Sequence, residues 1–149
     1  MPTIAPCLGN SATRTKKALP QNSGRRILIV EDNADGRESL RLLLELLGHQ
    51  VVAAEDGLQG LKMALAERPE VALIDIGLPG LDGYEVARRI RRAVGDRIFL
   101  IAQTAYAQAE DCQRAYEAGF DAHLTKPLDL DRLRYWLRVA RPVRDEVLS

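Results

Sequence analysis

The stretch ILIVED at residues 27–32 decides the fold, because four consecutive apolar residues lead directly into two acids. A short apolar run without alternation is typical of a strand that is covered on both faces, as in a parallel sheet. Two further runs have the same form: residues 71–74 lead into Asp75, and residues 98–102 lead into Gln103 and Thr104. The sequence therefore predicts a parallel sheet whose strands end in polar residues.

A weaker apolar run lies at residues 51–54, and residues 121–124 are expected to form a fifth strand mainly because of their position in the alternating order. Segments with helical periodicity separate these runs and follow the last one. A further helix is expected to begin after Asp82, and the other helices are expected over residues 35–47, 57–67, 107–118 and 129–140. Alternating strands and helices favour right-handed crossovers, with helices on both faces of one sheet.

The helical period also predicts which side chains face the sheet. In residues 57–67 it places four side chains on one buried face, namely Leu58, Leu61, Ala64 and Leu65. In the helix after Asp82 it turns four basic side chains toward solvent, namely Arg88, Arg89, Arg91 and Arg92.

Length and composition are typical of one globular domain, with 149 residues of which 46% are hydrophobic. We expect this domain to span residues 25–141. Residues 1–24 are rich in Pro, Ser, Asn, Thr and Lys, which predicts a disordered basic leader. Residues 142–149 are expected to form a short C-terminal tail.

Charge and cysteine content argue against several functions. Residues 1–26 carry five basic residues and no acid, whereas the other 16 basic and 21 acidic residues make the rest of the chain acidic. This balance argues against direct DNA binding. No apolar run is long enough for a membrane span or a signal peptide. The two cysteines, Cys7 and Cys112, are consistent with reduced thiols, so we expect a cytoplasmic protein.

Five polar residues lie at or just after the ends of the expected strands: Glu31, Asp32, Asp75, Thr104 and Lys126. The carboxyl ends of parallel strands meet at one edge of a sheet, so we expect these side chains to converge. Three carboxylates repel one another unless they bind protons or a cation, and oxygen ligands alone select Mg²⁺ or Mn²⁺. A carboxylate beside such a metal, an amine and a hydroxyl can accept a phosphoryl group.

Each of these residues has an ordinary structural interpretation when it is taken alone. Glu31 and Asp32 could cap a helix, Asp75 could belong to a turn, and Lys126 could be one solvated lysine among several. The combination of acids after two strands, a hydroxyl after the next and a lysine after the last favours a shared site.

The same residues resemble the receiver domains of two-component response regulators. The resemblance covers about residues 25–140 and is carried by four stretches: ILIVEDNAD at 27–35, VALIDIGLPGLDGY at 71–84, IAQTAYA at 101–107 and GFDAHLTKPLDL at 119–130. Within them, the second and the last look closest to receivers of hybrid sensor histidine kinases. The resemblance implies a flavodoxin-like, doubly wound α/β fold, with a five-stranded parallel sheet of order 2-1-3-4-5 and five helices.

The resemblance also implies a metal site and a phosphoacceptor. Asp75 matches the phosphoacceptor, and together with Glu31 and Asp32 it matches the acids that bind Mg²⁺, with Mn²⁺ as a substitute. Gly77, two residues after the acceptor, would offer its backbone carbonyl to the metal.

Further roles carry over to residues at the ends of the last two strands. Thr104 matches the switch hydroxyl that contacts the phosphoryl group, with the backbone N–H of Ala105 beside it. Lys126 would pair with the phosphoryl group. The bond from Lys126 to Pro127 is expected to be a cis peptide, which is energetically accessible only before proline.

Three positions concern switching and the lifetime of the phosphoryl group. His123 stands where the family usually has Tyr or Phe as a rotating switch residue; the imidazole either packs in place or turns inward when Thr104 moves. Tyr106 and Gly77 lie where side chains of this family tune the lifetime of the acyl phosphate. An exposed loop tyrosine without that role is the alternative for Tyr106.

The function implied is Mg²⁺-dependent transfer of a phosphoryl group to Asp75 from the phosphohistidine of a sensor histidine kinase or a histidine phosphotransfer protein. Such a receiver catalyses only its own phosphorylation and dephosphorylation, and it switches a surface that binds an unknown downstream protein. We expect no output domain, and a monomer or weak dimer. The sequence does not separate a phosphorelay shuttle from a stand-alone regulator.

Three other functions are alternatives to this one. A receiver-like binding module that acts without phosphorylation is the main alternative. Such a module is expected to lack one of the key acids or the lysine, and this chain has all of them. A haloacid-dehalogenase-type phosphatase needs a second aspartate two residues after the nucleophile, where this chain has Gly77. A flavodoxin-like nucleotide binder is disfavoured because the loop after the first strand is acidic and lacks glycines for a phosphate.

Overall fold

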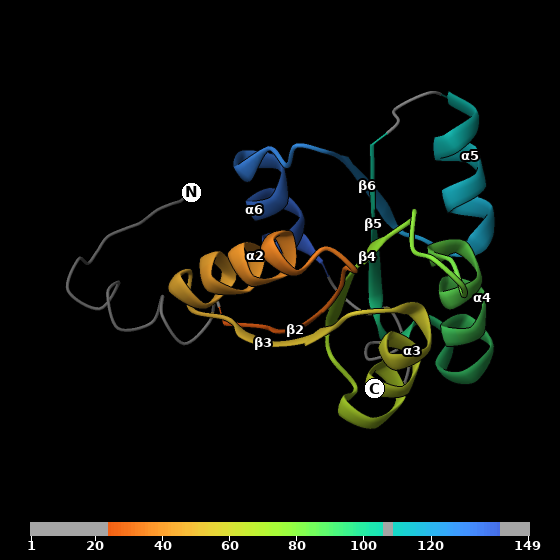
Figure 1. Cartoon of the computed structure of the whole chain (residues 1–149), viewed down its shortest axis with the longest axis horizontal. Helices are drawn as coiled ribbons and strands as arrows, with labels where there is room; N and C mark the ends of the chain where they lie inside the picture. Colours follow the sequence, from red (N-terminus) through yellow and green to blue (C-terminus); the bar gives the residue numbers. More distant parts are fainter. Residues whose placement is uncertain (1–23, 106–108, 141–149) are drawn as a thin grey trace, which may run out of the picture.

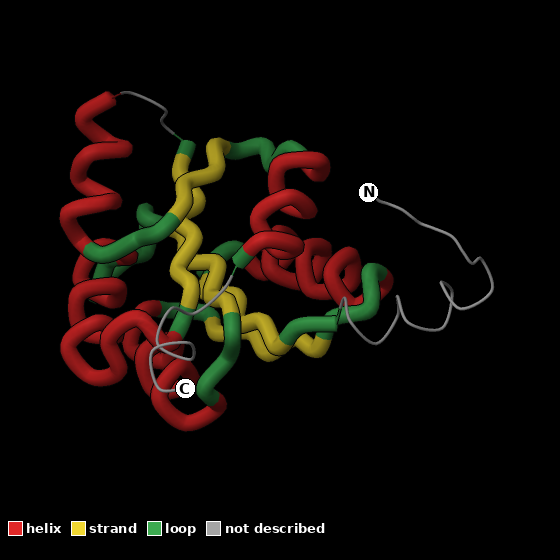
Figure 2. Tube along the Cα trace, turned by 180° about the vertical axis from the view of Figure 1, so that it is seen from behind, coloured by secondary structure: helices red, strands yellow, loops and turns green. Residues whose placement is uncertain are grey.

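The computed structural model of the protein describes residues 24–105 and 109–140 (Figure 1). The expected leader, Cys7, Tyr106 and the expected C-terminal tail lie outside the described residues, apart from Gly24. The described residues form one sheet between two layers of helices, which Figure 2 shows from behind.

The sheet has five parallel strands in the order β3-β2-β4-β5-β6, which is the order 2-1-3-4-5 that the resemblance implied. The strands lie close to the five apolar runs of the sequence: β2 (Arg26–Val30), β3 (Gln50–Ala54), β4 (Val71–Asp75), β5 (Phe99–Thr104) and β6 (Ala122–Thr125). The central strand β4 is buried along its whole length, so an uninterrupted apolar run was the right signal for it.

Five α-helices cover the two faces of the sheet: α2 (Ala34–Leu46), α3 (Gly57–Glu67), α4 (Gly83–Val94), α5 (Ala109–Ala118) and α6 (Leu130–Val139). Figure 1 shows α2 and α6 on one face and α3, α4 and α5 on the other. A short 3₁₀ helix, η1 (Gly95–Arg97), joins α4 to β5. The expected doubly wound architecture is therefore confirmed.

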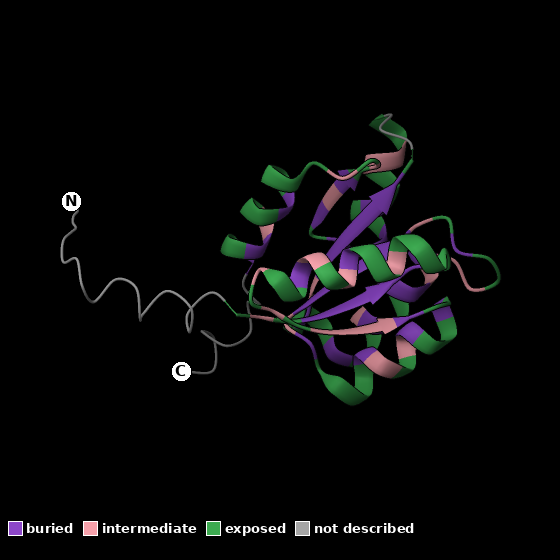
Figure 3. Ribbon diagram, turned by 60° about the vertical axis from the view of Figure 1, so that its left-hand side comes forward, coloured by how far each residue is buried: buried purple, intermediate pink, exposed green. Residues whose placement is uncertain are grey.

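Two hydrophobic clusters separate according to the alternation of side chains along each strand. Ile27 and Ile29 of β2 pack in the cluster under α2 and α6, whereas Leu28 and Val30 pack in the cluster under α3, α4 and α5. Figure 3 shows this buried layer in purple along the central strands. Because both faces are covered, the strand ends are where polar side chains can reach solvent.

Side chains at the helix N-termini position the helices after the strands. Asn33, Asp56, Asp82 and Asp129 each accept a hydrogen bond from a backbone N–H in the first turn of α2, α3, α4 and α6 respectively. The helix expected to begin after Asp82 is thus confirmed, and Asp82 caps it. Each such cap is worth about 1 kcal/mol.

The expected buried face of α3 is wrong in part. Leu58 and Leu65 are 53% and 38% exposed, and the residues of α3 that are buried are Gly57, Gly60 and Ala64. The reason is the close approach of α3 to the sheet: a Cβ atom on Gly60 would lie 2.6 Å from Cγ2 of Val30. At Gly60 the backbone of α3 therefore lies directly against the sheet, and Leu58 and Leu65 are turned outward, whereas Leu61 packs against the core as expected.

The expected exposure of Arg91 is also wrong. Its side chain is 16% exposed and donates hydrogen bonds to the backbone oxygens of Gly95, Ile98 and Gly119 and to Oδ2 of Asp121, at 2.6–2.8 Å. Arg91 lies on the polar side of α4, but the chain segments before β5 and β6 cover that side. Local periodicity could not show this cover.

Among the described residues, none of the helices has the length and apolar character needed to cross a membrane.

Candidate functional site

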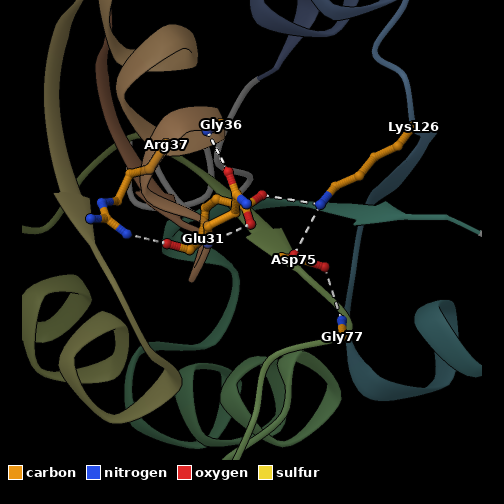
Figure 4. A network of polar contacts seen from close by, with 7 residues as sticks. Glu31, Gly36, Arg37, Asp75, Gly77 and Lys126 are labelled. Atoms are coloured by element: carbon orange, nitrogen blue, oxygen red, sulfur yellow. Dashed lines mark hydrogen bonds and ion pairs between the residues drawn. The ribbon is translucent and has the colours of Figure 1, made fainter.

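The carboxyl edge of the sheet brings together three of the expected residues (Figure 4). Glu31 follows β2, Asp75 ends β4 and Lys126 follows β6. Nζ of Lys126 donates hydrogen bonds to Oε1 of Glu31 at 3.1 Å and to Oδ2 of Asp75 at 3.0 Å. Asp75 and Glu31, which are 51 and 95 positions from Lys126 in the chain, thus share its ammonium group.

Asp32 completes a cluster of carboxylates. One carboxylate oxygen from each of Glu31, Asp32 and Asp75 lies within 4.8 Å of the others. Asp32 is exposed, whereas Glu31 and Asp75 are only 5% and 7% exposed. An all-oxygen set with one solvent-facing member suits a hard divalent cation that keeps some of its water, so these residues fit Mg²⁺.

Backbone groups fix the carboxylates in this cluster. The N–H of Gly77 donates to Oδ1 of Asp75 at 2.9 Å, and the N–H of Asn33 donates to Oε2 of Glu31 at 3.1 Å. A Cβ atom on Gly83 would lie 2.5 Å from the backbone oxygen of Asp75, so α4 begins directly against the end of β4. Only glycine permits that approach.

Electrostatics at the site favour an added cation. Burial raises the pKa of Glu31 above its ordinary value, the charge of Asp75 adds to this effect, and hydrogen bonds from Asn33 and Lys126 only partly oppose it. Burial alone would lower the pKa of Lys126, but its hydrogen bonds to Asp75 and Glu31 outweigh burial and raise it. The lysine is therefore held as a cation by carboxylates that carry excess negative charge.

Thr104, Ala105 and Pro127 lie where the sequence placed them. Thr104 ends β5 and is 5% exposed, its backbone oxygen accepts a hydrogen bond from the N–H of Lys126 at 2.8 Å, and Ala105 follows it in an exposed bend. The bond between Lys126 and Pro127 is cis, as expected. The roles expected for the Thr104 hydroxyl, the Ala105 N–H and the Gly77 carbonyl stay predictions.

His123 lies in β6 and is partly buried against α5. Sγ of Cys112 lies 3.7 Å from its Nδ1 and 3.9 Å from its Nε2. The contact agrees with a packed ring, and rotation of the ring on phosphorylation stays a prediction, as does the role of Tyr106.

Two groups that hold the acids were missed by the sequence argument. For Gly77, the resemblance implied a role for the carbonyl, whereas the N–H is the group that contacts Asp75. A backbone donor has no sequence signal of its own. Asn33 could have been found, because an asparagine directly before a helix is a recognisable N-cap: its Oδ1 accepts from the Gly36 N–H at 2.7 Å.

Taken together, the site can perform two kinds of chemistry. It can bind a hard cation through three carboxylates, and it presents one buried carboxylate, Asp75, beside an ammonium group that can neutralise an incoming anion. Positioning and charge neutralisation are the main requirements for phosphoryl transfer.

Comparison with known proteins agrees with this geometry. A family model described as response regulator receiver domain matches residues 27–138. The chain is 36% identical over 128 residues to sensor histidine kinase RcsC of Escherichia coli K12, a match that covers 86% of this chain and 13% of that kinase. It is 37% identical over 124 residues to response regulator MprA of Mycobacterium avium, which covers 80% of this chain and 54% of MprA.

Among solved structures, the receiver domain of sensor histidine kinase PA1611 from Pseudomonas aeruginosa PAO1 is 36% identical, with a TM-score of 0.72. The match covers 78% of this chain and 97% of that one, and the solved structure has a magnesium ion coordinated in its active site cleft. The chain thus matches the whole of that receiver, about an eighth of RcsC and about half of MprA.

Proposed function

The chain belongs to the response regulator receiver domain family, and from this premise we propose that it accepts a phosphoryl group on Asp75. The donor is the phosphohistidine of a sensor histidine kinase or of a histidine phosphotransfer protein. The observation that carries the proposal is the position of the Lys126 ammonium, 3.0 Å from Oδ2 of Asp75 and 3.1 Å from Oε1 of Glu31.

In the transfer step, a carboxylate oxygen of Asp75 forms a bond to phosphorus while the phosphorus–nitrogen bond of the donor breaks. The electron pair of that bond returns to the donor imidazole, and the product on this chain is an acyl phosphate. Mg²⁺ held by Glu31, Asp32 and Asp75 would neutralise charge on the phosphoryl oxygens. The hydrogen bond from the Gly77 N–H to Oδ1 orients the Asp75 carboxylate for this reaction.

Lys126 and Thr104 would then hold the phosphoryl group. The ammonium of Lys126, already hydrogen-bonded to Asp75, can pair with a phosphoryl oxygen at little structural expense. The Thr104 hydroxyl is the candidate contact that differs between two populated conformations of the surface formed by α5, β6 and α6. A phosphoryl group shifts that equilibrium only by contacting the two conformations differently.

The partners follow from the proposed chemistry and from the relatives. RcsC is a sensor histidine kinase and MprA a response regulator, so both support a place in a two-component or phosphorelay system. The downstream partner is a protein that binds the surface of α5, β6 and α6. The cytoplasmic location remains a prediction.

The proposal is tested by incubating the protein with Mg²⁺ and a small acyl phosphate donor, followed by intact mass measurement. We expect the wild-type chain to gain the mass of one phosphoryl group, and Asp75→Asn or removal of Mg²⁺ with a chelator to abolish the gain. Lys126→Ala is expected to slow the gain strongly, because the transferred group loses its pairing cation.

The controls separate phosphorylation from the alternative function. Glu67→Gln changes an exposed acid at the end of α3, remote from the site, and should leave the mass gain intact. A folded wild-type chain that gains no phosphoryl group would contradict the proposal and favour a receiver-like binding module that acts without phosphorylation.

A further inference from the structure

A cavity of about 460 Å³ lies beside the candidate site, between α2 and the segment that follows β6. Its walls include Leu40 and Leu43 of α2, together with Pro127 and Leu128, and Lys126 and Glu31 lie at its border with the carboxylate cluster. We call it the α2 cavity. A concave, mostly apolar space of this volume is the kind that binds small molecules.

One polar group that lines the α2 cavity lacks a hydrogen-bond partner among the described residues. Gln103 lines the cavity and is 2% exposed. Within residues 24–105 and 109–140, its Nε2 is the buried side-chain nitrogen or oxygen that lacks a hydrogen-bond partner. A buried donor without an acceptor is unfavourable, and such groups in native proteins call for an explanation.

The position of Gln103 in the sheet makes the missing acceptor more informative. Side chains alternate along β5, so Gln103 lies on the same face as Ile101, which packs in the cluster under α2 and α6. An apolar side chain would satisfy this environment without any unpaired donor. The amide is consistent with an acceptor that arrives from outside the protein and occupies the cavity.

The charges around the cavity limit what that acceptor can be. Glu31 borders the cavity, and one carboxylate oxygen each of Asp32 and Asp75 lies within 4.8 Å of a carboxylate oxygen of Glu31. The ammonium of Lys126 is already shared between Glu31 and Asp75. The local charge is therefore negative, which disfavours a carboxylate ligand. A neutral carbonyl or amide oxygen satisfies Nε2 without this repulsion.

We propose that the α2 cavity binds a neutral, largely apolar small molecule whose carbonyl or amide oxygen accepts a hydrogen bond from Nε2 of Gln103. The ligand's apolar part lies against Leu40, Leu43 and Leu128. Binding does not depend on phosphorylation of Asp75, so it can be tested without Mg²⁺ or a phosphodonor. Because Lys126 borders both places, a bound ligand would also alter phosphorylation, a consequence that rests on the proposed function.

The test uses N-isobutylbenzamide as the probe and the full chain labelled with ¹⁵N. We expect saturable shifts of the Gln103 side-chain amide resonances, together with shifts of residues that line the cavity. The matched anion 4-isobutylbenzoate should bind roughly tenfold more weakly, because the local carboxylates repel it. Gln103→Leu should weaken binding of the amide by roughly fivefold, because the ligand oxygen loses its hydrogen-bond donor.

Two variants on the exposed surface of α2 locate the binding. Ser39 lines the cavity at an exposed position, whereas Leu42 is 50% exposed and does not line it. Ser39→Trp should block the probe, and Leu42→Trp should bind it as the wild type does; both are checked for folding by the dispersion of the amide spectrum. The proposal is overturned by non-saturable shifts, by equal binding of both probes, or by unchanged binding in Gln103→Leu or folded Ser39→Trp.

Discussion

Lys126 and Arg91 are both cations held among oxygen atoms, at opposite ends of the sheet. Lys126 lies at the carboxyl edge and contacts the side chains of Glu31 and Asp75. Arg91 lies at the amino edge, where its guanidinium contacts three backbone oxygens and the side chain of Asp121. Lys126 is therefore held by carboxylates, whereas Arg91 is held mainly by backbone oxygens.

The difference lies in charge balance. Arg91 and Asp121 neutralise each other, and Oδ2 of Asp121 also accepts a hydrogen bond from the N–H of Leu100 at 2.9 Å. At the carboxyl edge, two carboxylates of the three-carboxylate cluster share one ammonium, so negative charge remains when all are ionised. The amino edge therefore stabilises the fold, whereas at the carboxyl edge the carboxylates repel one another, and a bound metal ion would relieve that repulsion.

The largest expected effect is a loss of stability when the contacts of Arg91 at the amino edge are removed. Arg91→Ala should lower the free energy of unfolding by about 2–4 kcal/mol, because it removes four charged hydrogen bonds and leaves the Asp121 carboxylate unpaired. Urea unfolding measures the loss. Phosphorylation by a small donor should persist in the folded fraction.

Arg92→Ala is the matched control for that prediction. The Arg92 side chain is 70% exposed and forms an ion pair with Glu85 at 3.5 Å, so its removal should cost less than about 0.5 kcal/mol. Equal losses in the two variants would contradict the stabilising role assigned to the amino edge.

The next largest effect is expected when Mg²⁺ binds to the carboxylate cluster at the carboxyl edge. Mg²⁺ at ten times its dissociation constant should raise the free energy of unfolding by about 1.4 kcal/mol, because it binds the folded chain alone. Thermal unfolding with and without Mg²⁺ measures this increase. Asp32→Asn, which removes the charge of the exposed member of the cluster, should abolish most of the response while a similar change at Glu67 does not.

A smaller change in stability is expected when one charge is removed from the same cluster. Without Mg²⁺, Asp75→Asn should raise the free energy of unfolding by about 1 kcal/mol, because it ends the repulsion between Asp75 and Glu31. On the proposed function, the same variant should not gain a phosphoryl group. A clear loss of stability in urea would show that attraction to Lys126 outweighs repulsion between the acids.

The smallest expected effect is a pH dependence near the amino edge. The N–H of Arg25 donates to Nδ1 of His49 at 3.0 Å. Burial, followed by the charge of Arg25, lowers the pKa of His49 below 6.5 in the folded state. A lowered pKa means that the neutral ring favours folding, so this contribution is present above pH 6.5 and is lost as the pH falls through the folded-state pKa.

His49→Gln should reduce that dependence. Between pH 7.5 and pH 5.5 the wild type should lose about 0.3 kcal/mol more stability than the variant, a small figure because the residue is only partly buried and water screens the ring. Urea unfolding across this range gives the difference between the two proteins. The opposite sign would mean that the protonated ring is the form favoured by the fold.

The sequence was most informative where local pattern and topology act together. The apolar runs located the strands, and the parallel arrangement then required Glu31 and Asp75 to meet at one edge, as they do. Lys126 was placed beside them by the same argument. For these residues, the end of a strand is both a local signal and a position in space.

The sequence was less informative where distant segments decide the environment. Arg91 sits on the polar side of α4, yet chain segments far along the sequence cover it. Leu58 is exposed because a glycine sets how closely α3 approaches the sheet. The unpaired Nε2 of Gln103 and the contact of His123 with Cys112 depend on side-chain placement across helices and strands, which periodicity does not encode.

The oxygens that Arg91 contacts have a consequence for how this protein can evolve. Three of the four belong to the backbone, at Gly95, Ile98 and Gly119, and every amino acid supplies such an oxygen. Mutations that preserve the path of the main chain in these loops therefore leave the arginine anchored. We expect the side chains around these loops to tolerate substitution, while the constraint falls on Arg91, on Asp121 and on Gly95 and Gly119, the two glycines of positive φ whose oxygens Arg91 contacts.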